Sequence, residues 1–320
     1  MTERKARAMK LVFCGTPEFA VPTLRAALDA GHEVALVLTQ PDRPAGRKLE
    51  LQASAVKRFA VERGLAVVQP ERIKANLELR EMLEAIRPDA ILVVAYGRIV
   101  PQWMLDLPRF GNINLHGSLL PKYRGAAPIQ WAIANGERET GVTTMRLDAG
   151  LDTGDILLAR AMPIAPDATS AEMYPVLADV GAELMLETLR GLEAMILSAR
   201  TQDHAAATYA PILTREDGRL DISRTAQQTY DRWRGFQPWP GCYGTFREKR
   251  ILLSRIHPID THIPHTSDGG TLYLGVHDLR MFVGKGTVLC LDEVQLEGKA
   301  RMSGVQFVRD FQVKQGERVG

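Results

Sequence analysis

The sequence is poor in cysteine and has no long apolar run. Its cysteines, Cys14, Cys242 and Cys290, are odd in number and far apart among 320 residues, so they suggest neither a disulfide framework nor a cysteine-based zinc site. No apolar run approaches the roughly 20 residues that a membrane span needs, and the apolar stretch 11–14 is far too short for a secretory signal. We therefore expect a protein of the reducing cytoplasm with no membrane partner.

Internal repeats and low-complexity tracts are also absent, and the composition is that of an ordinary globular protein, with 45% hydrophobic and 24% charged residues. A chain of 320 residues exceeds what one compact core usually holds, so two domains are expected. Residues 209–320 carry 16 Lys+Arg and 13 Asp+Glu, a net of +3, whereas the rest carries 24 and 25, a net of −1. This excess permits a nucleic-acid partner without requiring one.

The first half alternates short apolar runs with helical patterns, which is typical of a Rossmann-like, mostly parallel α/β sheet with crossover helices. The predicted strands are residues 10–14, 33–39, 66–69, 90–95 and 112–116, with 142–147 and 156–163 extending the sheet. The predicted helices are residues 17–30, 54–62, 77–86, 129–135 and 170–192. Ligands bind beyond the carboxyl ends of the strands in open sheets of this kind. The loops that this rule selects follow Thr39, Ala95, His116 and Leu147.

The pattern changes after the polar stretch 198–208, which we interpret as a linker between a catalytic domain, 1–197, and a second domain, 209–320. Short β-type runs separated by Gly, Pro and Asp turns fill the second domain; they are residues 244–246, 251–256, 271–276, 281–283 and 288–294. These runs predict a smaller all-β domain, an OB-like barrel or a sandwich.

The strongest chemical pattern lies in residues 112–125. Asn114 and His116 are two residues apart on an apolar strand, so their side chains point to the same face. The chain then enters a loop rich in Gly and Pro. A carboxamide beside an imidazole at the carboxyl end of a sheet suits oxyanion stabilisation and proton transfer. The alternative is a structural histidine held by a hydrogen bond.

A second polar loop, residues 147–155, follows another predicted strand and holds Asp148, Asp152 and Asp155 among small residues. It could be a solvated turn before the next strand. Alternatively, Asp152 lies near His116 and orients it, as carboxylate–imidazole pairs do.

Together these stretches resemble the folate-dependent formyltransferases. The pattern is Asn114-x-His116 running into Ser118-Leu119-Leu120-Pro121-x-Tyr123-Arg124-Gly125, with Asp152-Thr153-Gly154 downstream. Three further segments, residues 13–20, 40–47 and 236–240, are similar specifically to the methionyl-tRNA formyltransferase family. The resemblance extends from about Leu11 to at least Gly241 and is weaker beyond that point.

This resemblance implies transfer of a formyl group from 10-formyltetrahydrofolate to the α-amine of methionine on initiator tRNA, for translation initiation. It implies that Asn114, His116 and Asp152 are the catalytic residues. The folate-binding residues that it implies are Ser118, Leu119, Leu120 and Pro121. The chemistry agrees, because amine attack creates an oxyanion to which Asn114 and a protonated His116 can donate, while Asp152 accepts the amine proton. We expect no metal cofactor, and a monomer.

The loop of residues 41–52 has no periodic apolar pattern and carries Arg43, Arg47 and Lys48 among Pro and Gly. Exposed loops often carry such residues for solubility alone. The resemblance instead implies that this insertion contacts the acceptor end of the tRNA, with Arg47 at the key basic position. Leu49-Glu50-Leu51 follows where many relatives are more basic, which would weaken or shift the contact.

Other interpretations stay open. A glycinamide-ribonucleotide formyltransferase would share the His and Asp chemistry but lack the second domain, and the basic loop disfavours an enzyme acting on an amino-sugar nucleotide. A nicotinamide-dependent oxidoreductase would carry a G-x-G-x-x-G fingerprint, which Gly15-Thr16-Pro17 does not supply. A non-catalytic RNA-binding protein would leave the Asn114 and His116 pair without a purpose.

Two residue types are expected to take no part in the chemistry. Cys14 ends an apolar strand, which is a poor place for an activated thiolate. The histidines of the second domain match no metal-site signature, so we expect solvated loop residues. They are His257, His262, His265 and His277.

Overall fold

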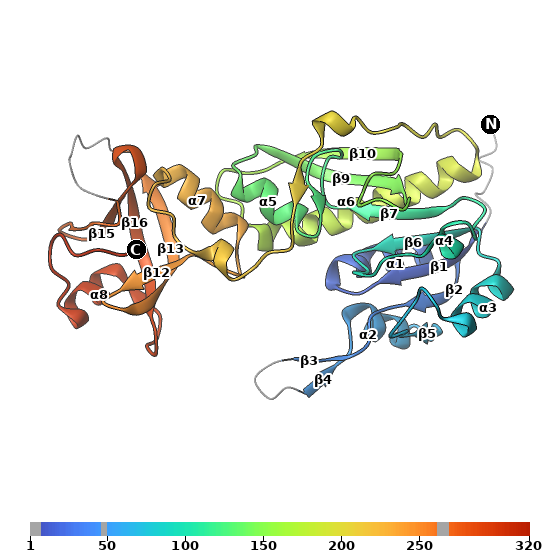
Figure 1. Ribbon diagram of the computed structural model, residues 1–320, viewed down its shortest axis with the longest axis horizontal. Helices are drawn as coiled ribbons and strands as arrows, with labels where there is room; N and C mark the ends of the chain where they lie inside the picture. The colour runs from blue at the N-terminus through green and yellow to red at the C-terminus, as the bar shows by residue number, and fades with distance from the viewer. Residues whose placement is uncertain (1–7, 46–49, 261–268) are drawn as a thin grey trace. The chain divides into compact units, whose positions relative to one another are not determined.

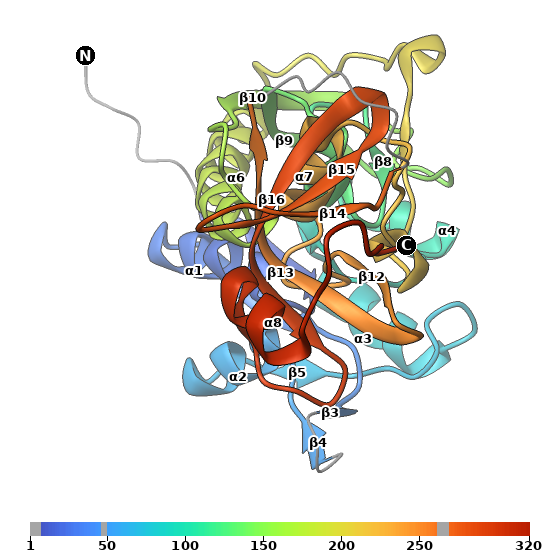
Figure 2. The same cartoon turned by 90° about the vertical axis from the view of Figure 1, so that its left-hand side faces the viewer.

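The computed structural model describes residues 8–45, 50–260 and 269–320, which form two compact units (Figures 1 and 2). Unit 1 contains the described residues of Met1–Pro128, together with Glu139–Pro163 and Tyr174–Pro211. Unit 2 contains Ile129–Arg138, Ile164–Met173 and the described residues of Ile212–Gly320. Each unit therefore draws on segments that are separated in the sequence. Within these described ranges, no helix combines the length and apolar character needed to cross a membrane.

Unit 1 is built on a seven-stranded sheet with the order β10-β9-β7-β6-β1-β2-β5. Its strands are β1 (Lys10–Gly15), β2 (Glu33–Leu38), β5 (Val67–Val68), β6 (Ala90–Val94), β7 (Asn112–His116), β9 (Glu139–Arg146) and β10 (Ile156–Pro163). The strands from β5 to β7 pair in parallel, whereas β9 and β10 are antiparallel to their neighbours. Every residue of β6 and β7 is buried, as in a parallel sheet covered on both faces.

Helices connect and follow the strands of unit 1. They are α1 (Val21–Asp29), α2 (Ala55–Glu62), α3 (Leu77–Ile86), α4 (Gln102–Leu105) and α6 (Ser170–Glu193), the last belonging to unit 1 from Tyr174 onward. The side chains of Ser54 and Asn76 cap α2 and α3 by accepting backbone N–H bonds of 3.1 and 3.0 Å. Such caps satisfy amides that have no partner within the helix.

Two short ladders lie outside the main sheet of unit 1. β3 (Arg43–Ala45) pairs antiparallel with β4 (Glu50–Gln52), and this pair projects away from the sheet (Figures 1 and 2). β8 (Arg124–Gly125) pairs in parallel with β11 (Tyr209–Ala210), and a 3₁₀ turn, η2 (His204–Ala206), precedes β11. The sequence predicts neither ladder, because strands of two or three residues are too short to show an alternating pattern.

The predicted α/β class is confirmed, with differences at the ends of elements. The helix predicted from residue 17 becomes α-helical only at Val21, after a 3₁₀ turn, η1 (Glu18–Ala20); Pro22 lies in the first turn of α1, where a missing N–H costs nothing. The strand predicted over 66–69 is reduced to β5, which lies at the sheet edge and pairs only with β2. The strand predicted over 142–147 begins earlier, at Glu139.

Unit 2 is built on an antiparallel sheet with the order β12-β13-β16-β15-β14. Its strands are β12 (Tyr243–Phe246), β13 (Lys249–Ile259), β14 (Leu272–Leu274), β15 (Leu279–Val283), β16 (Thr287–Leu296) and β17 (Met302–Ser303), the last pairing with β16. Short 3₁₀ turns, η3 (Glu216–Gly218) and η4 (Gly284–Gly286), lie in its connections.

The last described residues join the two edges of this sheet. Backbone hydrogen bonds connect Glu317 to Leu272 of β14 (2.7 Å) and connect Gly320 to Thr245 of β12 in both directions (2.6 and 3.0 Å). The segment 317–320 therefore contacts both edge strands, and the sheet curls into the small barrel that the sequence predicts.

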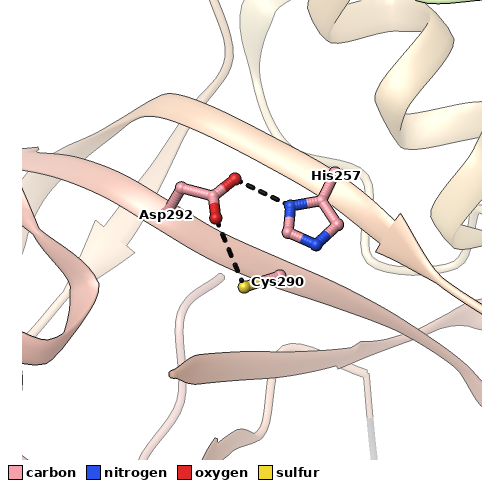
Figure 3. Close-up of side chains that lie close together, drawn as sticks. All are labelled: His257, Cys290 and Asp292. Carbon is pink, nitrogen blue, oxygen red and sulfur yellow. Dashed lines mark hydrogen bonds and ion pairs between the residues drawn. The ribbon is translucent and has the colours of Figure 1, made fainter. Parts of the chain in front are cut away.

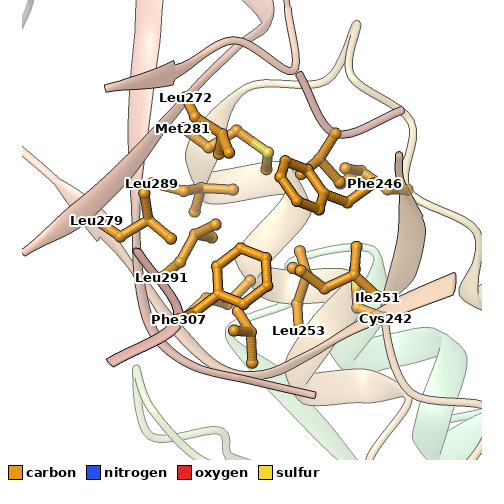
Figure 4. Close-up of a cluster of buried hydrophobic side chains, with 14 of the residues drawn as sticks. Cys242, Phe246, Ile251, Leu253, Leu272, Leu279, Met281, Leu289, Leu291 and Phe307 are labelled. Carbon is orange, nitrogen blue, oxygen red and sulfur yellow. The ribbon is translucent and has the colours of Figure 1, made fainter. Parts of the chain in front are cut away.

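The interior of this barrel is apolar, and two helices complete it. Phe246 of β12 and Phe307 of α8 (Gly304–Phe311) are almost fully buried, with ring centroids 5.2 Å apart in an edge-on contact (Figure 4). Burial of one such ring stabilises the fold by about 1.5–3 kcal/mol. The second helix, α7 (Ala226–Gly235), starts at a capping box formed by Thr225 and Gln228. The predicted β-barrel domain is confirmed, and these two helices are additions to it. α5 (Pro128–Ala134) also contributes to unit 2 from Ile129 onward.

Candidate active site

Asn114 and His116 lie at the carboxyl end of β7, between β6 and β9. Both side chains are buried, with residue exposures of 8% and 5%. In the part of the chain that the structure describes, the Asn114 carboxamide has no hydrogen-bond partner, so its N–H groups are available to a ligand. Both residues belong to the regular strand β7, so their side chains lie on the same face, as their two-residue spacing predicts.

The ring of His116 is held from both sides. Its Nε2 lies 2.8 Å from the carbonyl oxygen of Tyr123. Because a carbonyl can only accept, Nε2 carries a hydrogen, and Nδ1 is the ring atom left for chemistry. Nδ1 lies 3.7 Å from Asp152 Oδ2, which is beyond direct hydrogen-bond length. The carboxylate therefore lies near the imidazole, as hypothesised from the sequence for this pair.

Asp152 is held in an uncommon backbone conformation. Its φ is +52°, in the left-handed region that side chains rarely adopt. Asp152 Oδ2 accepts a 2.8 Å bond from the backbone N–H of Gly125. Gly125 can reach it because it has no Cβ, which would lie 2.5 Å from the Ala210 carbonyl oxygen. Among the described residues nothing donates to Asp152 Oδ1, so this oxygen remains available to accept a proton.

Gln202 fixes the Asp152 loop, and the sequence gives no signal for it. Its amide N–H groups donate to the carbonyl oxygens of Asp152 (2.9 Å) and Gly154 (2.7 Å). Its Oε1 accepts from Arg124 Nε (3.1 Å) and Nη2 (2.6 Å). Arg124 Nη2 also lies 3.1 Å from His204 Nδ1. Residues of the segment predicted as a linker thus lie within the candidate site.

The rest of the Asp152 loop is organised by Asp148 and Gly154. Asp148 Oδ1 accepts from the hydroxyl of Thr153 (2.7 Å) and from the N–H of Gly150 (3.0 Å). Gly154 lies so close to β9 that a Cβ there would be 1.8 Å from the Arg146 carbonyl oxygen. The path of the loop past Asp152 therefore depends on glycine at 154.

The residues predicted to line the folate divide into two pairs. Ser118 is almost fully buried and donates to the Lys122 carbonyl oxygen (2.6 Å), and Leu120 packs in an apolar cluster with Met145 and Ile156. The side chains of Ser118 and Leu120 therefore make contacts within the protein. The other two, Leu119 and Pro121, are only partly buried and remain available for contact.

A second set of polar residues follows β1, β2 and β6, the neighbouring strands of the same sheet. Gln40, after β2, donates to the carbonyl oxygens of Tyr96 (3.0 Å) and Gly97 (3.2 Å), and Thr16, after β1, donates to Tyr96 (3.1 Å). Tyr96 follows β6, and its hydroxyl is buried without a partner among the described residues. Burial also raises the pKa of this phenol, so it stays protonated. Sequence reasoning selects the loop after β6 but not Tyr96 itself.

Of the residues predicted to bind tRNA, the structure describes Arg43, whereas Arg47 and Lys48 lie outside the described residues. Arg43 is exposed on β3 and, within the described part of the chain, forms no ion pair. The base of the β3–β4 pair is anchored by Asp42, whose carboxylate lies 2.6 Å from Lys57 Nζ and 2.7 Å from Gln69 Nε2. These two bonds lower the pKa of Asp42.

Cys14 and the described histidines of unit 2 can be compared with their predicted positions. Cys14 is fully buried in β1, and burial raises the pKa of its thiol, which removes it as a thiolate nucleophile. The expectation of a loop position is wrong for His257, which lies in β13 and bonds Asp292 at 2.8 Å. His277 is in an exposed bend. His262 and His265 lie outside the described residues.

Comparison with known proteins assigns the family. Residues 9–189 match the model described as formyl transferase, and residues 212–312 match that described as formyl transferase, C-terminal domain. The chain is 57% identical over 312 residues to the methionyl-tRNA formyltransferase of Acidobacterium capsulatum, covering 98% of this chain and 100% of that protein. The chain belongs to the methionyl-tRNA formyltransferase family. The relative of the same name from Koribacter versatilis is 53% identical and covers 98% of this chain and 99% of its own.

A solved structure of the sugar 3N-formyl transferase WlaRD, in the presence of dTDP and 5-N-formyl-THF, is also similar. It has a TM-score of 0.66 and 18% identity, and the match covers 92% of this chain and all of that chain. At this identity the likeness concerns the fold. The family models and the 57% identity, rather than this structure, confirm the resemblance at the level of the family.

Proposed function

We propose that this chain transfers the formyl group of 10-formyltetrahydrofolate to the α-amino group of methionine on initiator tRNA. The observation that carries the proposal is the 57% identity to a methionyl-tRNA formyltransferase along nearly the whole chain. The geometry adds support, because Asn114, His116 and Asp152 lie together at a sheet end where ligands of such folds bind. The products are N-formylmethionyl-tRNA and tetrahydrofolate.

In the first step the neutral amine attacks the formyl carbon, and the carbonyl π pair moves to oxygen to give a tetrahedral oxyanion. The unpartnered carboxamide of Asn114 donates to this oxygen. His116 Nδ1 donates as well when the ring carries both hydrogens, since Nε2 is already committed to Tyr123. One preorganised donor of this kind lowers the barrier by roughly 3–4 kcal/mol.

The attacking amine must also lose a proton, and Asp152 is placed to accept it. Its Oδ2 is occupied by the Gly125 N–H, so Oδ1 is the oxygen that we assign to proton transfer. The tetrahedral intermediate then collapses, the C–N10 bond breaks, and N10 takes up a proton as tetrahydrofolate leaves. No formyl-enzyme intermediate is needed, and no metal takes part in these steps.

Apolar side chains beside the site suit a flat folate ring. Ile99, in the loop after β6, and Leu151, in the loop after β9, are large apolar residues with exposures of 91% and 61%. We propose that they contact folate together with Leu119 and Pro121. Ser118 and Leu120 would shape the pocket through their backbone, because their side chains are bonded or packed internally.

The proposed tRNA contacts rest on the positions of positively charged residues. Arg43, Arg47 and Lys48 would contact the acceptor end, and residues 209–320, with an excess of three positive charges, would supply further phosphate contacts. In this proposal residues 1–197 form the catalytic domain and 209–320 the tRNA-binding domain. We further propose that the enzyme acts as a monomer in the cytoplasm; analytical ultracentrifugation with and without tRNA tests the monomer.

One assay decides the function. The purified chain is incubated with 10-formyltetrahydrofolate and, separately, with initiator methionyl-tRNA, elongator methionyl-tRNA, a dTDP-amino sugar or glycinamide ribonucleotide. We expect formylation of the initiator tRNA at the highest kcat/KM. Asp152→Asn should reduce kcat by orders of magnitude, whereas the control Asp155→Asn, in the same loop, should not. Preferential formylation of the amino sugar or of glycinamide ribonucleotide would reject the proposal in favour of that substrate.

A further inference from the structure

Three side chains of different chemistry meet on the sheet of unit 2 (Figure 3). His257 of β13 lies directly opposite Cys290 of β16 in the antiparallel ladder. Directly opposite residues share a face and have Cβ atoms about 4.5–5.5 Å apart, so the register alone brings the imidazole beside the thiol. Asp292 joins them from β16, and one ligand atom from each of the three residues lies within 4.8 Å of the other two.

Asp292 follows Cys290 by two residues on β16, so the strand period places both side chains on the same face. The pairing of β13 with β16 shifts between Arg255 and Ile256, which leaves Asp292 with no residue opposite. Asp292 Oδ2 lies 2.8 Å from His257 Nδ1, and its Oδ1 lies 3.6 Å from Cys290 Sγ.

We propose that His257, Cys290 and Asp292 bind one Zn²⁺ ion, with water as the fourth ligand. Zn–N and Zn–O bonds of about 2.0–2.2 Å and Zn–S bonds of about 2.3 Å place tetrahedral ligands about 3.3–3.6 Å apart. Side-chain rotations close the difference from the present spacing. A set of one nitrogen, one sulfur and one oxygen suits Zn²⁺, whereas Mg²⁺ and Ca²⁺ prefer oxygen alone.

Access and local charge are compatible with this ion. The side chains of His257 and Asp292 are 52% and 30% exposed, so an ion can enter from solvent. Arg280 of β15 lies opposite Cys290 on its other side, but its charge is offset by Asp278, at 2.8 Å.

The thiol of Cys290 would change state on binding. A free cysteine thiol carries a proton, which it must lose to become a metal ligand. Zn²⁺ takes the place of that proton, as it does at other thiolate ligands. The ion would then join β13 to β16 at the point where the ladder is interrupted, and would stabilise unit 2 because it binds the folded state alone.

Cobalt titration of the full chain tests the site without reference to activity. The protein is freed of metal with a chelator, titrated with Co²⁺ and then challenged with Zn²⁺. We expect one equivalent of Co²⁺ with a thiolate-to-cobalt charge-transfer band in the near ultraviolet, which Zn²⁺ abolishes. The band should be lost in Cys290→Ser, and Asp292→Asn should weaken Co²⁺ binding by about tenfold or more. His277→Gln, which alters an exposed histidine of the same unit, is the control and should bind normally.

Two results would overturn the proposal. One is the absence of a charge-transfer band from the native chain at saturating Co²⁺. The other is a band of unchanged intensity in Cys290→Ser. Circular dichroism establishes that each variant is folded, and Asp292→Asn keeps the thiol in place should Cys290→Ser be unstable. Zn²⁺ should also raise the unfolding temperature of the native chain but not that of a folded Asp292→Asn chain; an equal rise in both would count against the site.

Discussion

Removing the amide of Gln202 tests whether this side chain positions Asp152. The residue is 4% exposed and makes four hydrogen bonds with oxygen and nitrogen partners, two to loop carbonyls and two from the buried guanidinium of Arg124, besides a long contact of 3.9 Å with Met145 Sδ. In Gln202→Met a side chain of similar shape remains while all four bonds are lost. The change therefore separates hydrogen bonding from packing.

The expected loss of stability follows from these bonds. Each neutral amide–carbonyl bond contributes about 1 kcal/mol net, and the bonding of a charged guanidinium about 1.5–3 kcal/mol. Gln202→Met should therefore lose about 4 kcal/mol, a large part of the roughly 5–15 kcal/mol that stabilises a domain. With a urea dependence of about 3 kcal/mol per molar, the unfolding midpoint should fall by about 1.3 M.

Turnover should fall for a different reason. Without Gln202 the left-handed backbone of Asp152, at φ +52°, loses the bond that holds its carbonyl. A catalytic group displaced by about 1 Å can cost about 100-fold in rate, so we expect kcat to fall by about that factor with little change in the KM for folate. Gln202→Glu keeps an acceptor for Arg124 but cannot donate to the loop. Its second oxygen would face the two loop carbonyls to which Gln202 now donates, so it should regain only part of the stability and none of the kcat.

Urea unfolding and initial-rate kinetics on the variants decide this, with Thr201→Ala, an exposed neighbour, as the control. Two outcomes would refute the reasoning. A Gln202→Glu enzyme with normal kcat would show that the donor bonds do not position Asp152. A Gln202→Met chain that loses less than about 1 kcal/mol would show that water replaces the lost bonds at no cost.

Three further predictions concern the loop, the tRNA and the chain segments. Gly154→Ala should lower kcat strongly, because its Cβ would lie 1.8 Å from a backbone oxygen. Gly150→Ala should have a milder effect, because its Cβ would meet the side chain of Thr153, which can move. Measuring the rates and folate affinities of both variants distinguishes a local shift from global unfolding. Arg43→Ala should reduce the salt dependence of tRNA binding by about one phosphate contact, and an unchanged slope in a filter-binding series would remove Arg43 from the interface. A chain ending at residue 211 should bind folate, whereas one ending at 198 should bind it weakly because β11 and its neighbours are missing; equal affinities in equilibrium dialysis would contradict this.

Strand β7 could be predicted because the pattern that indicates it lies within a few consecutive residues. An apolar run of five residues fixes β7, and the two-residue period then places Asn114 and His116 on one face. The nearness of Asp152 could be hypothesised only from the chemistry of carboxylate–imidazole pairs, because β9 runs antiparallel to β7 and its following loop starts beside Asn112. Its left-handed backbone could not, because the bonds that hold it come from residues far along the chain.

The features of the site that could not be predicted from the sequence depend on contacts between residues far apart in the chain. Gln202 lies in a polar stretch with no apolar period, and it reaches the site only because β8 pairs with β11 across about 85 residues. By contrast, α7 was predictable from its start, since Thr225 and Gln228 form the T-x-x-Q spacing of a capping box. The Gly, Pro and Asp turns around this stretch obscure that local signal.

The joining of the barrel edges by residues 317–320 has a consequence for biosynthesis. While the chain is being translated, β12 and β14 have both emerged before the segment that bonds to them, so each presents an open strand edge to solvent. The barrel can close only after residues 317–320 have emerged, whereas every strand of the main sheet of unit 1 is synthesised by residue 163. We therefore expect the nascent chain to carry a folded sheet of unit 1 while the barrel of unit 2 is still incomplete.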